Sequence, residues 1–441
     1  MQIDESAQTF NLGVVIRETG LKADTIRAWE RRYGLPSPGR TSGGHRLYSQ
    51  RDIDTLKWLA ARRAEGLTIS RAVRLWRQLE SEAKDPLVVM PLAESGVAGL
   101  AARVKGDVLD EIRRNWLDAC LAFDEPGANA TLAQAHALYP AEIVALNVIR
   151  AAMAEIGDRW EAGEISVHQE HFASELATRQ LEALIAATPP PRQSGTIAVG
   201  CPQHEEHTLS GLIITLLLRR SGQPALFLGA NIPHEAFLPA LRHLSPRLVI
   251  MSAQRLSTAA SLARLARTLN EHGVHLAFGG RVFVRNVELR NLVAGYYVGD
   301  QLDIVADSVE VLLQAPLRRM ELPPVSPAYE RALGRFNTRR LQLHARVSEL
   351  LERQRTFPLQ YLETINHFVG EDIRAALELG NLELVNQEIL WARSLLEHRQ
   401  FAPDHLRSYF RAYRQAAEEC LGDAGRPILT WLRSLPLNPQ E

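Results

Sequence analysis

Short apolar runs alternate with longer helical stretches through the middle of the chain. The runs are rich in Val, Ile and Leu, and the stretch after the first of them, Leu212 to Leu218, is long enough and apolar enough for a buried helix. Apolar strands that alternate with helices are typical of an α/β fold with a parallel, doubly wound sheet and crossover helices. The strands that we predict are residues 196–200, 224–229, 247–253, 275–280 and 296–300.

The beginning of the chain has apolar positions at a helical spacing. Residues 11–16 and 23–33 predict two short helices joined by a turn, and Ile26 and Trp29 share the face that turns toward the core. Residues 39–48 carry glycines and arginines and predict a hairpin. This order of elements indicates a helix-turn-helix followed by a wing.

Helical spacing also fills the two other parts of the chain. Residues 87–192 are rich in alanine and leucine and predict a small antiparallel bundle. A linker with several prolines, residues 322–327, precedes a last segment that is helical almost throughout. We therefore expect a multidomain protein: a winged helix-turn-helix, a helical bundle, a doubly wound parallel sheet and an all-α C-terminal region. The predicted boundaries are 1–86, 87–192, 193–320 and 321–441.

Composition narrows the class of protein. A chain of 441 residues exceeds one ordinary domain, and 46% hydrophobic residues are enough for sizeable cores. A net charge of −1 excludes a uniformly basic nucleic-acid coat, so any DNA-binding surface is local. The three cysteines lie far apart, which suits a reduced compartment. Because the first residues lack a basic and apolar leader and no apolar run reaches about 18 residues, we expect a cytoplasmic protein without a membrane partner.

One loop carries the strongest candidate chemistry. Glu205 and His207 stand between the predicted strand 196–200 and the apolar helix, and open α/β sheets bind ligands at the carboxyl ends of their strands. A carboxylate two residues from a histidine can hold one ring nitrogen, which fixes the tautomer of a metal-ligating imidazole. The alternative is a charged surface loop.

The same loop resembles the Glu/Asp-x-His-x-x-Gly motif of cobalamin-binding domains, with Glu205 at the acidic position and His207 at the histidine position. The resemblance implies that His207 is the lower axial ligand of cobalt. Ser210 stands where the family has glycine, and Gly211 follows one place later. The chain therefore departs from the family where the corrin approaches the backbone.

Small residues end two later strands. Ser252 and the pair Gly279-Gly280 match positions that, in the cobalamin-binding family, line the pocket for the nucleotide tail. Small side chains there leave room for a buried dimethylbenzimidazole. A tight turn alone would also explain the two glycines.

The helical segment carries a tryptophan and a Glu-His pair at a fixed spacing. Trp160 and Glu170-His171 resemble the signature of the helical cap in CarH-type adenosylcobalamin photoreceptors. The resemblance implies that the bundle covers the upper face of the corrin, with Trp160 against the 5′-deoxyadenosyl group and Glu170-His171 beside it. Core packing and a solvated helix face are the alternatives. Glu161 replaces the histidine that ligates cobalt after photolysis in that family, so His168 or His171 would have to serve instead, or a bis-histidine product would not form.

Residues 11 to about 80 resemble the winged helix of MerR-family regulators, since the second helix, the glycine hairpin and Asp52 occur in family order. The resemblance implies that the protein binds two-fold sites on double-stranded DNA as a dimer. No sustained heptad run follows Pro86, so contacts between subunits must come from elsewhere. The side chains that we expect at the operator are Thr25, Arg27, Arg31, Arg32, Arg40, His45, Arg46 and Tyr48.

The last segment adds side chains of types that ligate metals. They could hold a second chromophore or a metal, but a dimerising helical bundle is the expectation that we favour. These side chains are His344, His367, His398, His405 and Cys420.

Together these resemblances imply a transcriptional regulator, not an enzyme. Its chromophore would be adenosylcobalamin, and its homo-oligomeric assembly, a dimer or a tetramer, and its operator binding would change when light breaks the cobalt–carbon bond. A sensor of cobalamin level or of another tetrapyrrole, without light switching, is the alternative. A cobalamin-dependent methyl-carrier enzyme is a third reading, but no part of the chain is patterned as the substrate barrel or methyltransferase module that it would need.

Overall fold

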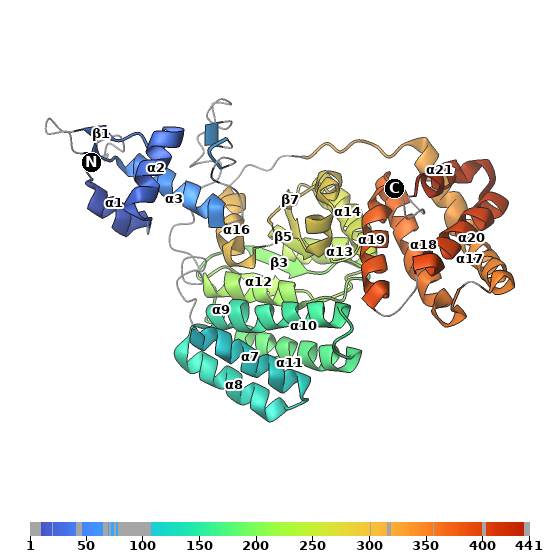
Figure 1. The fold of residues 1–441 in the computed structure, drawn as a ribbon, viewed down its shortest axis with the longest axis horizontal. Coiled ribbons are helices and arrows are strands. Elements are labelled where there is room, and N and C mark those ends of the chain that lie inside the picture. The colour runs from blue at the N-terminus through green and yellow to red at the C-terminus, as the bar shows by residue number, and fades with distance from the viewer. Residues whose placement is uncertain are drawn as a thin grey trace. The chain divides into compact units, whose positions relative to one another are not determined.

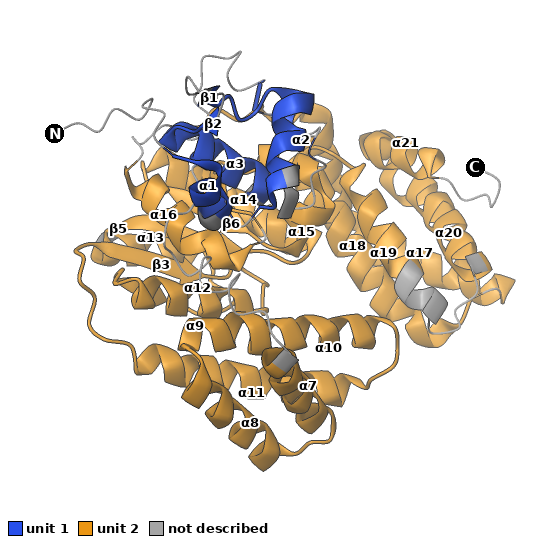
Figure 2. Ribbon diagram, turned by 60° about the vertical axis from the view of Figure 1, so that its left-hand side comes forward, with its two compact units in different colours: residues 1–94 blue, residues 95–441 orange. Residues whose placement is uncertain are grey.

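The computed structural model describes residues 10–19, 21–40, 46–64, 69, 72–74, 76–77, 107–299, 301–314, 319–355, 357–398 and 403–435. The chain divides into two compact units, residues 1–94 and 95–441, which Figure 2 colours separately. The first unit has a hydrophobic core of its own, and the second unit holds two. None of the helices that the structure describes is both long and apolar enough to span a membrane.

The first unit is a small helical domain with a two-stranded antiparallel hairpin. Ile26 and Trp29 are buried in one core with Trp58, which confirms the predicted inward face of the second helix. Gly34 ends that helix with a φ of 69°, a left-handed conformation that suits glycine. The hairpin tip, residues 41–45, lies outside the described residues. The elements are α1 (Leu12–Thr19), α2 (Ala23–Tyr33), β1 (Gly39–Arg40), β2 (Arg46–Leu47) and α3 (Gln50–Ala64).

A five-stranded sheet forms the middle of the second unit. Its order is β4-β3-β5-β6-β7, and each neighbouring pair is parallel, which confirms the predicted doubly wound fold. The direction of winding reverses between β3 and β5, and sheets of this kind bind ligands in the crevice outside the carboxyl ends of the strands at such a point. The strands are β3 (Thr196–Gly200), β4 (Ala225–Phe227), β5 (Pro246–Ser252), β6 (Leu276–Gly279) and β7 (Tyr296–Tyr297).

The two faces of the sheet belong to different hydrophobic cores. Ile197 and Val199 of β3 lie in one core, and Ala198 between them lies in the other, as the alternation of a strand requires. Helices α12 and α16 cover the first face, and α13, α14 and α15 cover the second (Figure 1). Their bounds are α12 (Leu209–Arg220), α13 (His234–Leu244), α14 (Leu256–Glu271), α15 (Arg281–Arg285) and α16 (Val305–Gln314), with short 3-10 turns η2 (Val287–Leu292) and η3 (Leu302–Ile304).

The helices before the sheet form a bundle that packs on α12 and shares its core; we call residues 107–186 the cap. Trp116 and Ile156 are fully buried inside it. Ser166 begins the last helix of the cap with a capping box, in which its hydroxyl accepts from the N–H of Gln169 and its own N–H donates to the Gln169 side chain. The elements are α7 (Asp107–Leu121), α8 (Glu125–Leu138), α9 (Ala141–Ile143), the π-helical η1 (Val144–Arg150), α10 (Ala151–Glu161) and α11 (Val167–Ala186).

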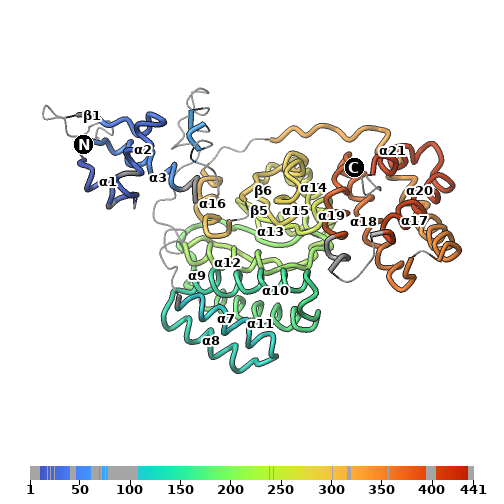
Figure 3. The backbone as a smooth tube through the Cα atoms, in the orientation of Figure 1, coloured from blue at the N-terminus to red at the C-terminus, as the bar shows by residue number. Residues whose placement is uncertain are grey.

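The last segment forms a second bundle, residues 327–434, which we call the C-terminal bundle. Residues 319–326 lead into it without helix or strand (Figure 3) and are held on α14 by Met320, whose backbone pairs with the Asn270 side chain at 2.8 and 2.9 Å. Ile373 and Leu377 share one core with Ala263 of α14, so the bundle is continuous with the sheet. The elements are α17 (Pro327–Gln354), η4 (Leu359–Tyr361), α18 (Leu362–Leu379), α19 (Leu384–His398), α20 (Pro403–Leu421), η5 (Gly422–Gly425) and α21 (Arg426–Ser434).

Candidate functional site

A buried carboxylate organises the loop between β3 and α12. Glu205 is only 1% exposed. Its Oε1 accepts from Nδ1 of His207 at 2.5 Å and from the His207 backbone N–H at 3.1 Å. Its Oε2 accepts from the Gln254 N–H and the Thr258 hydroxyl, both at 2.7 Å. Four donors from two loops therefore fix one side chain at the point where the winding of the sheet reverses.

The charges of this pair stabilise each other. Burial acts to raise the pKa of Glu205, but the hydrogen bonds and charge of His207, with those from Thr258 and Gln254, lower it overall. The hydrogen bond to Glu205 raises the pKa of His207 against the effect of burial. Nδ1 is engaged and two-thirds of the imidazole side chain is exposed (66%), so Nε2 is the nitrogen that remains for a ligand.

Thr258 and Gln254 belong to the candidate site, and the sequence prediction missed them. They come from the loop after β5 and the first turn of α14, and Thr258 lies 53 positions after Glu205. The sequence did contain a signal for Thr258, a hydroxyl in the first turn of the helix that follows β5. The carboxyl ends of adjacent parallel strands meet at one edge of a sheet, so this hydroxyl can reach the loop after β3. They complete the support that a ligating histidine needs.

Small residues stand at strand ends beside this loop. Ser252 is buried, and its hydroxyl lies 3.8 Å from Sγ of Cys201. Burial raises the pKa of the Cys201 thiol to about 12, so it stays protonated. Gly280 has a φ of 118°, and a Cβ there would meet the carbonyl oxygen of Ala253 at 2.0 Å. Close packing of two loops thus demands glycine at 280 whatever ligand is bound.

The positions that depart from the cobalamin motif have a local explanation. Ser210 is half-buried in the first turn of α12. Gly211 is buried, and a Cβ on it would come within 2.8 Å of the Phe227 ring. The close contact at Gly211 is therefore with Phe227 of β4, inside the protein.

The cap brings its predicted residues to the same edge of the sheet. Glu170 and His171 lie in the first turn of α11, where a Glu170 oxygen lies 2.8 Å from Nδ1 of His171 and the other accepts from Ser174 at 2.8 Å. After Glu205, the charge of Glu170 also contributes to the raised pKa of His207, so the cap faces the histidine loop. Trp160 is half-buried at the end of α10.

Glu161 points its carboxylate at the sheet. Its Oε1 lies 2.5 Å from Nη2 of Arg281 and 3.8 Å from Nη2 of Arg285, both on α15. Glu161, which stands in place of the family's second histidine, is thus paired with two arginines.

The metal-ligand types in the C-terminal bundle do not assemble into a site. Among the residues that the structure describes, no group of three or more His, Cys, Asp or Glu is placed to hold a metal ion. His344 lies beside Tyr413 and His405 beside Phe357. A second chromophore in this bundle therefore gains no support from the side chains.

Seven of the eight predicted DNA-contacting residues divide into three groups. Arg27, Arg31 and Arg32 are exposed on α2, and Thr25 is half-buried there. Arg46 of β2 donates from Nε to a Glu30 oxygen at 2.7 Å, which ties the wing to α2. His45 and the side chain of Arg40 lie outside the described residues.

Tyr48 needs a correction. We expected it at the DNA, but its side chain is fully buried in the core of the first unit. Its backbone pairs with Phe10 in both directions, at 2.8 and 3.0 Å. An aromatic residue at the end of a short strand packs inward here because the hairpin has one face on the core.

Two family models match the chain. The MerR HTH family regulatory protein model matches residues 10–79, and the B12 binding domain model matches residues 112–185. The HTH-type transcriptional repressor CarH of Myxococcus xanthus is 33% identical over 247 residues, which cover 56% of this chain and 79% of that protein. The HTH-type transcriptional repressor CarA of the same organism is 26% identical over 249 residues, with 56% and 77% covered. The trimethylamine corrinoid protein of Methanosarcina barkeri is 25% identical over 174 residues, with 37% and 78% covered.

Proposed function

Because the chain belongs to the family of CarH-type regulators, which join a MerR helix-turn-helix to a B12-binding region, we propose that it is a light-responsive transcriptional regulator whose chromophore is adenosylcobalamin. The observation that carries the proposal is the buried Glu205 that holds His207 at the reversal point of the sheet, with Glu161 and Glu170 of the cap at the same edge.

The residues present fit a corrinoid. Nε2 of His207 would ligate the cobalt, held in orientation by Glu205, and Ser252 with Gly279 and Gly280 would line the nucleotide tail. Bound adenosylcobalamin would supply a cobalt–carbon bond that light breaks. Trp160 would contact the adenosyl group, so the effect of this residue would depend on the size of the group that the cobalt carries.

Regulation would follow from linkage between the two units. A ligand shifts DNA binding only as far as its affinities for the DNA-bound and free states differ. We propose that the dark, loaded protein assembles as a homo-oligomer, a dimer or a tetramer, that binds an operator, and that illumination weakens both. Glu161 offers no imidazole for the lit state, so we expect that state to be less firmly fixed than in sensors with the second histidine.

Absorption, mass and operator binding test this proposal together. The absorption spectrum of protein purified with and without adenosylcobalamin reports binding. Size-exclusion and operator-binding measurements on loaded protein, first dark and then lit, report the switch. If mass and DNA affinity are the same in both states, the hypothesis of light switching is wrong, and the protein is better explained as a sensor of cobalamin level. Glu161 favours this second function, because it stands where the family has a histidine.

The DNA-binding unit is tested separately, with Arg27→Ala and Arg46→Ala. A base contact that is lost relaxes specificity, whereas a phosphate contact that is lost lowers all affinities and reduces the salt slope by about one. Glu30→Gln is the control for Arg46, because it breaks the same ion pair without removing the arginine. If neither arginine variant changes operator binding, the winged helix does not contact DNA as proposed.

A further inference from the structure

Three arginines gather beside the cofactor site at the carboxyl edge of the sheet. Arg255 precedes α14, and Arg281 and Arg285 lie on α15. The backbone N–H of Arg281 donates to Oε1 of Gln254 at 3.0 Å, which joins the loops that follow β6 and β5. We call Arg255, Arg281 and Arg285 the arginine cluster.

The cap meets this cluster through Glu161. Burial and the neighbouring charge of Arg281 lower the pKa of Arg285, so the two guanidinium groups repel each other. The Glu161 carboxylate, 2.5 Å from Arg281 and 3.8 Å from Arg285, offsets that repulsion. Without it, the end of α10 would face two like charges.

The C-terminal bundle meets the same cluster from the other side. The guanidinium of Arg285 lies 5.2 Å from the ring centre of Trp391, and that of Arg255 lies 4.5 Å from the ring of Phe368. Burial raises the pKa of Glu388 on α19, and the charges of Arg285, Arg255 and Arg281 act to lower it, so this carboxyl lies within electrostatic range of the cluster. Arg285 is thus the arginine that contacts both parts, the ring of Trp391 in the bundle and the carboxylate of Glu161 in the cap.

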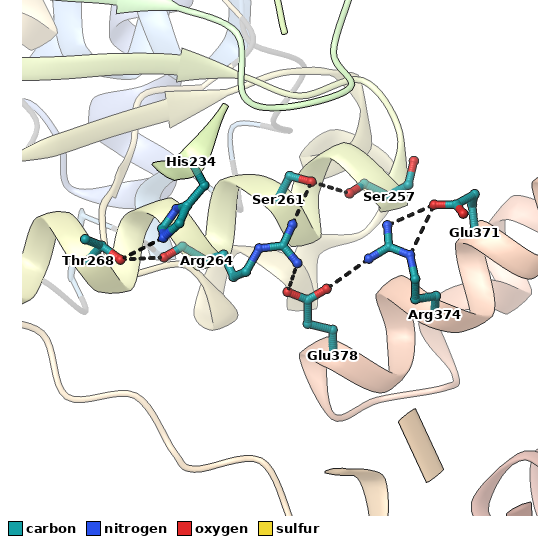
Figure 4. Close-up of polar contacts among 8 residues, drawn as sticks. All are labelled: His234, Ser257, Ser261, Arg264, Thr268, Glu371, Arg374 and Glu378. Carbon is teal, nitrogen blue, oxygen red and sulfur yellow. Dashed lines mark hydrogen bonds and ion pairs between the residues drawn. The ribbon is translucent and has the colours of Figure 1, made fainter. Parts of the chain in front are cut away.

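The bundle itself is fixed to the sheet. Arg264 of α14 pairs with Glu378 of α18 at 2.5 Å, and Arg374 joins Glu378 to Glu371 at 3.3 and 2.9 Å (Figure 4). The Arg264–Glu378 pair and the common core of α14 and α18 join the sheet to the bundle, whereas the two pairs of Arg374 lie within α18. The cap shares a core with α12, and at this edge of the sheet it contacts α15 through the partly exposed ion pair of Glu161 with Arg281.

We propose that the arginine cluster is a positioning element through which the C-terminal bundle sets how firmly the cap closes over the cofactor site. Glu161 is the cap's half of the contact, and Trp391 with Glu388 is the bundle's half. The inference rests on the proposed function in one respect only, the assumption that the cap closes over a cofactor. The contact itself is a property of the chain without any cofactor.

Charge reversal in the full-length chain tests the cap's half. Deuterium exchange of residues 160–171 is measured first without cofactor, for Glu161→Arg, Arg281→Glu and the double variant. We expect each single variant to raise exchange roughly fivefold, as for loss of an exposed ion pair with added repulsion, and the double variant to restore it. The control is Glu142→Arg with Arg220→Glu: that pair also joins cap and sheet, at 2.7 Å, but its arginine lies at the far end of α12, so residues 160–171 should be unaffected.

The bundle's half is tested with Trp391→Ala and, in case that variant does not fold, Glu388→Gln. Neither residue is in the cap, yet both should raise exchange in residues 160–171 by about twofold. Unchanged exchange in folded Trp391→Ala and Glu388→Gln would overturn the role of the bundle, and failure of the double reversal to restore exchange would overturn the role of Glu161.

The ratio of affinities for adenosylcobalamin and hydroxocobalamin then separates this inference from the proposed function. The ratio should fall in the variants that raise exchange. If no variant and no wild-type protein binds either form, the proposed function fails while the exchange results still decide the contact. If exchange rises but the ratio stays constant, the contact does not position the cap over the cofactor, and that part of the inference is wrong.

Discussion

The two sides of the proposed cofactor site are held by different physical means. On the sheet side, Glu205 is almost completely buried and its two oxygens receive four donors. On the cap side, Glu161 and Arg281 form an ion pair whose side chains are 23% and 46% exposed. A buried, satisfied carboxylate is strongly determined, whereas an exposed ion pair is weak and responds to salt. The sheet side is thus suited to hold a ligand, and the cap side to release one.

The strongest effect should come from His207→Ala on the sheet side. Removing the proposed ligand should lower cobalamin affinity by about 100-fold or leave the bound form without its nitrogen ligand, because loss of a residue that only hydrogen-bonds to a ligating histidine already costs about 10–100-fold. Titration followed by absorption measures both. His204→Asn is the control, since His204 is exposed on the same loop with a φ of 69° that asparagine tolerates. An unchanged spectrum and affinity would remove His207 as the ligand.

Glu205→Gln should have the next largest effect. An amide cannot accept from all four donors, so we expect cobalamin affinity to fall about tenfold and the free energy of unfolding by about 1–3 kcal/mol. The native pKa of Glu205 is lowered, so the carboxylate stabilises the fold above its unfolded pKa and loses that effect as pH falls through the native value. In urea unfolding experiments from neutral to acid pH, the free energy of unfolding should therefore decrease less steeply in the variant than in the wild-type protein. Glu206→Gln, an exposed neighbour, is the control.

Trp160→Ala should act selectively on the cap side. Adenosylcobalamin affinity should fall roughly two- to tenfold, the range for losing one aromatic contact, while affinities for methyl- and hydroxocobalamin change little. The adenosyl group is the one large enough to reach the cap. Equal losses for all three forms would mean that Trp160 is an ordinary packing residue.

The smallest effect is the response to salt. Screening should lower adenosylcobalamin affinity of the wild-type protein by about twofold between low and high ionic strength, because the Glu161–Arg281 pair is exposed. Glu161→Gln should bind more weakly at low salt and show almost no salt dependence. A salt dependence that is equal in the two proteins would show that this pair does not hold the cap.

The sequence predicted the sheet well because strands and crossover helices leave a local pattern. The predicted strand 196–200 is β3, and each of the four later predicted strands overlaps one of β4 to β7. The pair Glu205-His207 was predictable for the same reason, since two positions on one loop need no knowledge of the rest of the fold. The donors from Gln254 and Thr258 depend on the pairing of β3 with β5, which no local pattern contains.

Other contacts could not be read from spacing. The ion pair of Glu161 with Arg281 joins residues 120 positions apart, and nothing near either residue indicates its partner. Tyr48 illustrates the opposite error, because it occurs in a motif of DNA-contacting residues but packs in the core. Motif membership indicates that a position matters without saying which way its side chain points.

Helix α14 has a practical consequence for work with shortened chains. Its residues from Leu256 to Ala263 are buried without interruption, because the sheet covers one side and α18 the other. A protein that ends before residue 319 would present this outer, alanine-rich face to water, and apolar patches of that kind promote association. Oligomers of such a fragment would form through this uncovered face, so any change of assembly size with light has to be measured on the whole 441-residue chain.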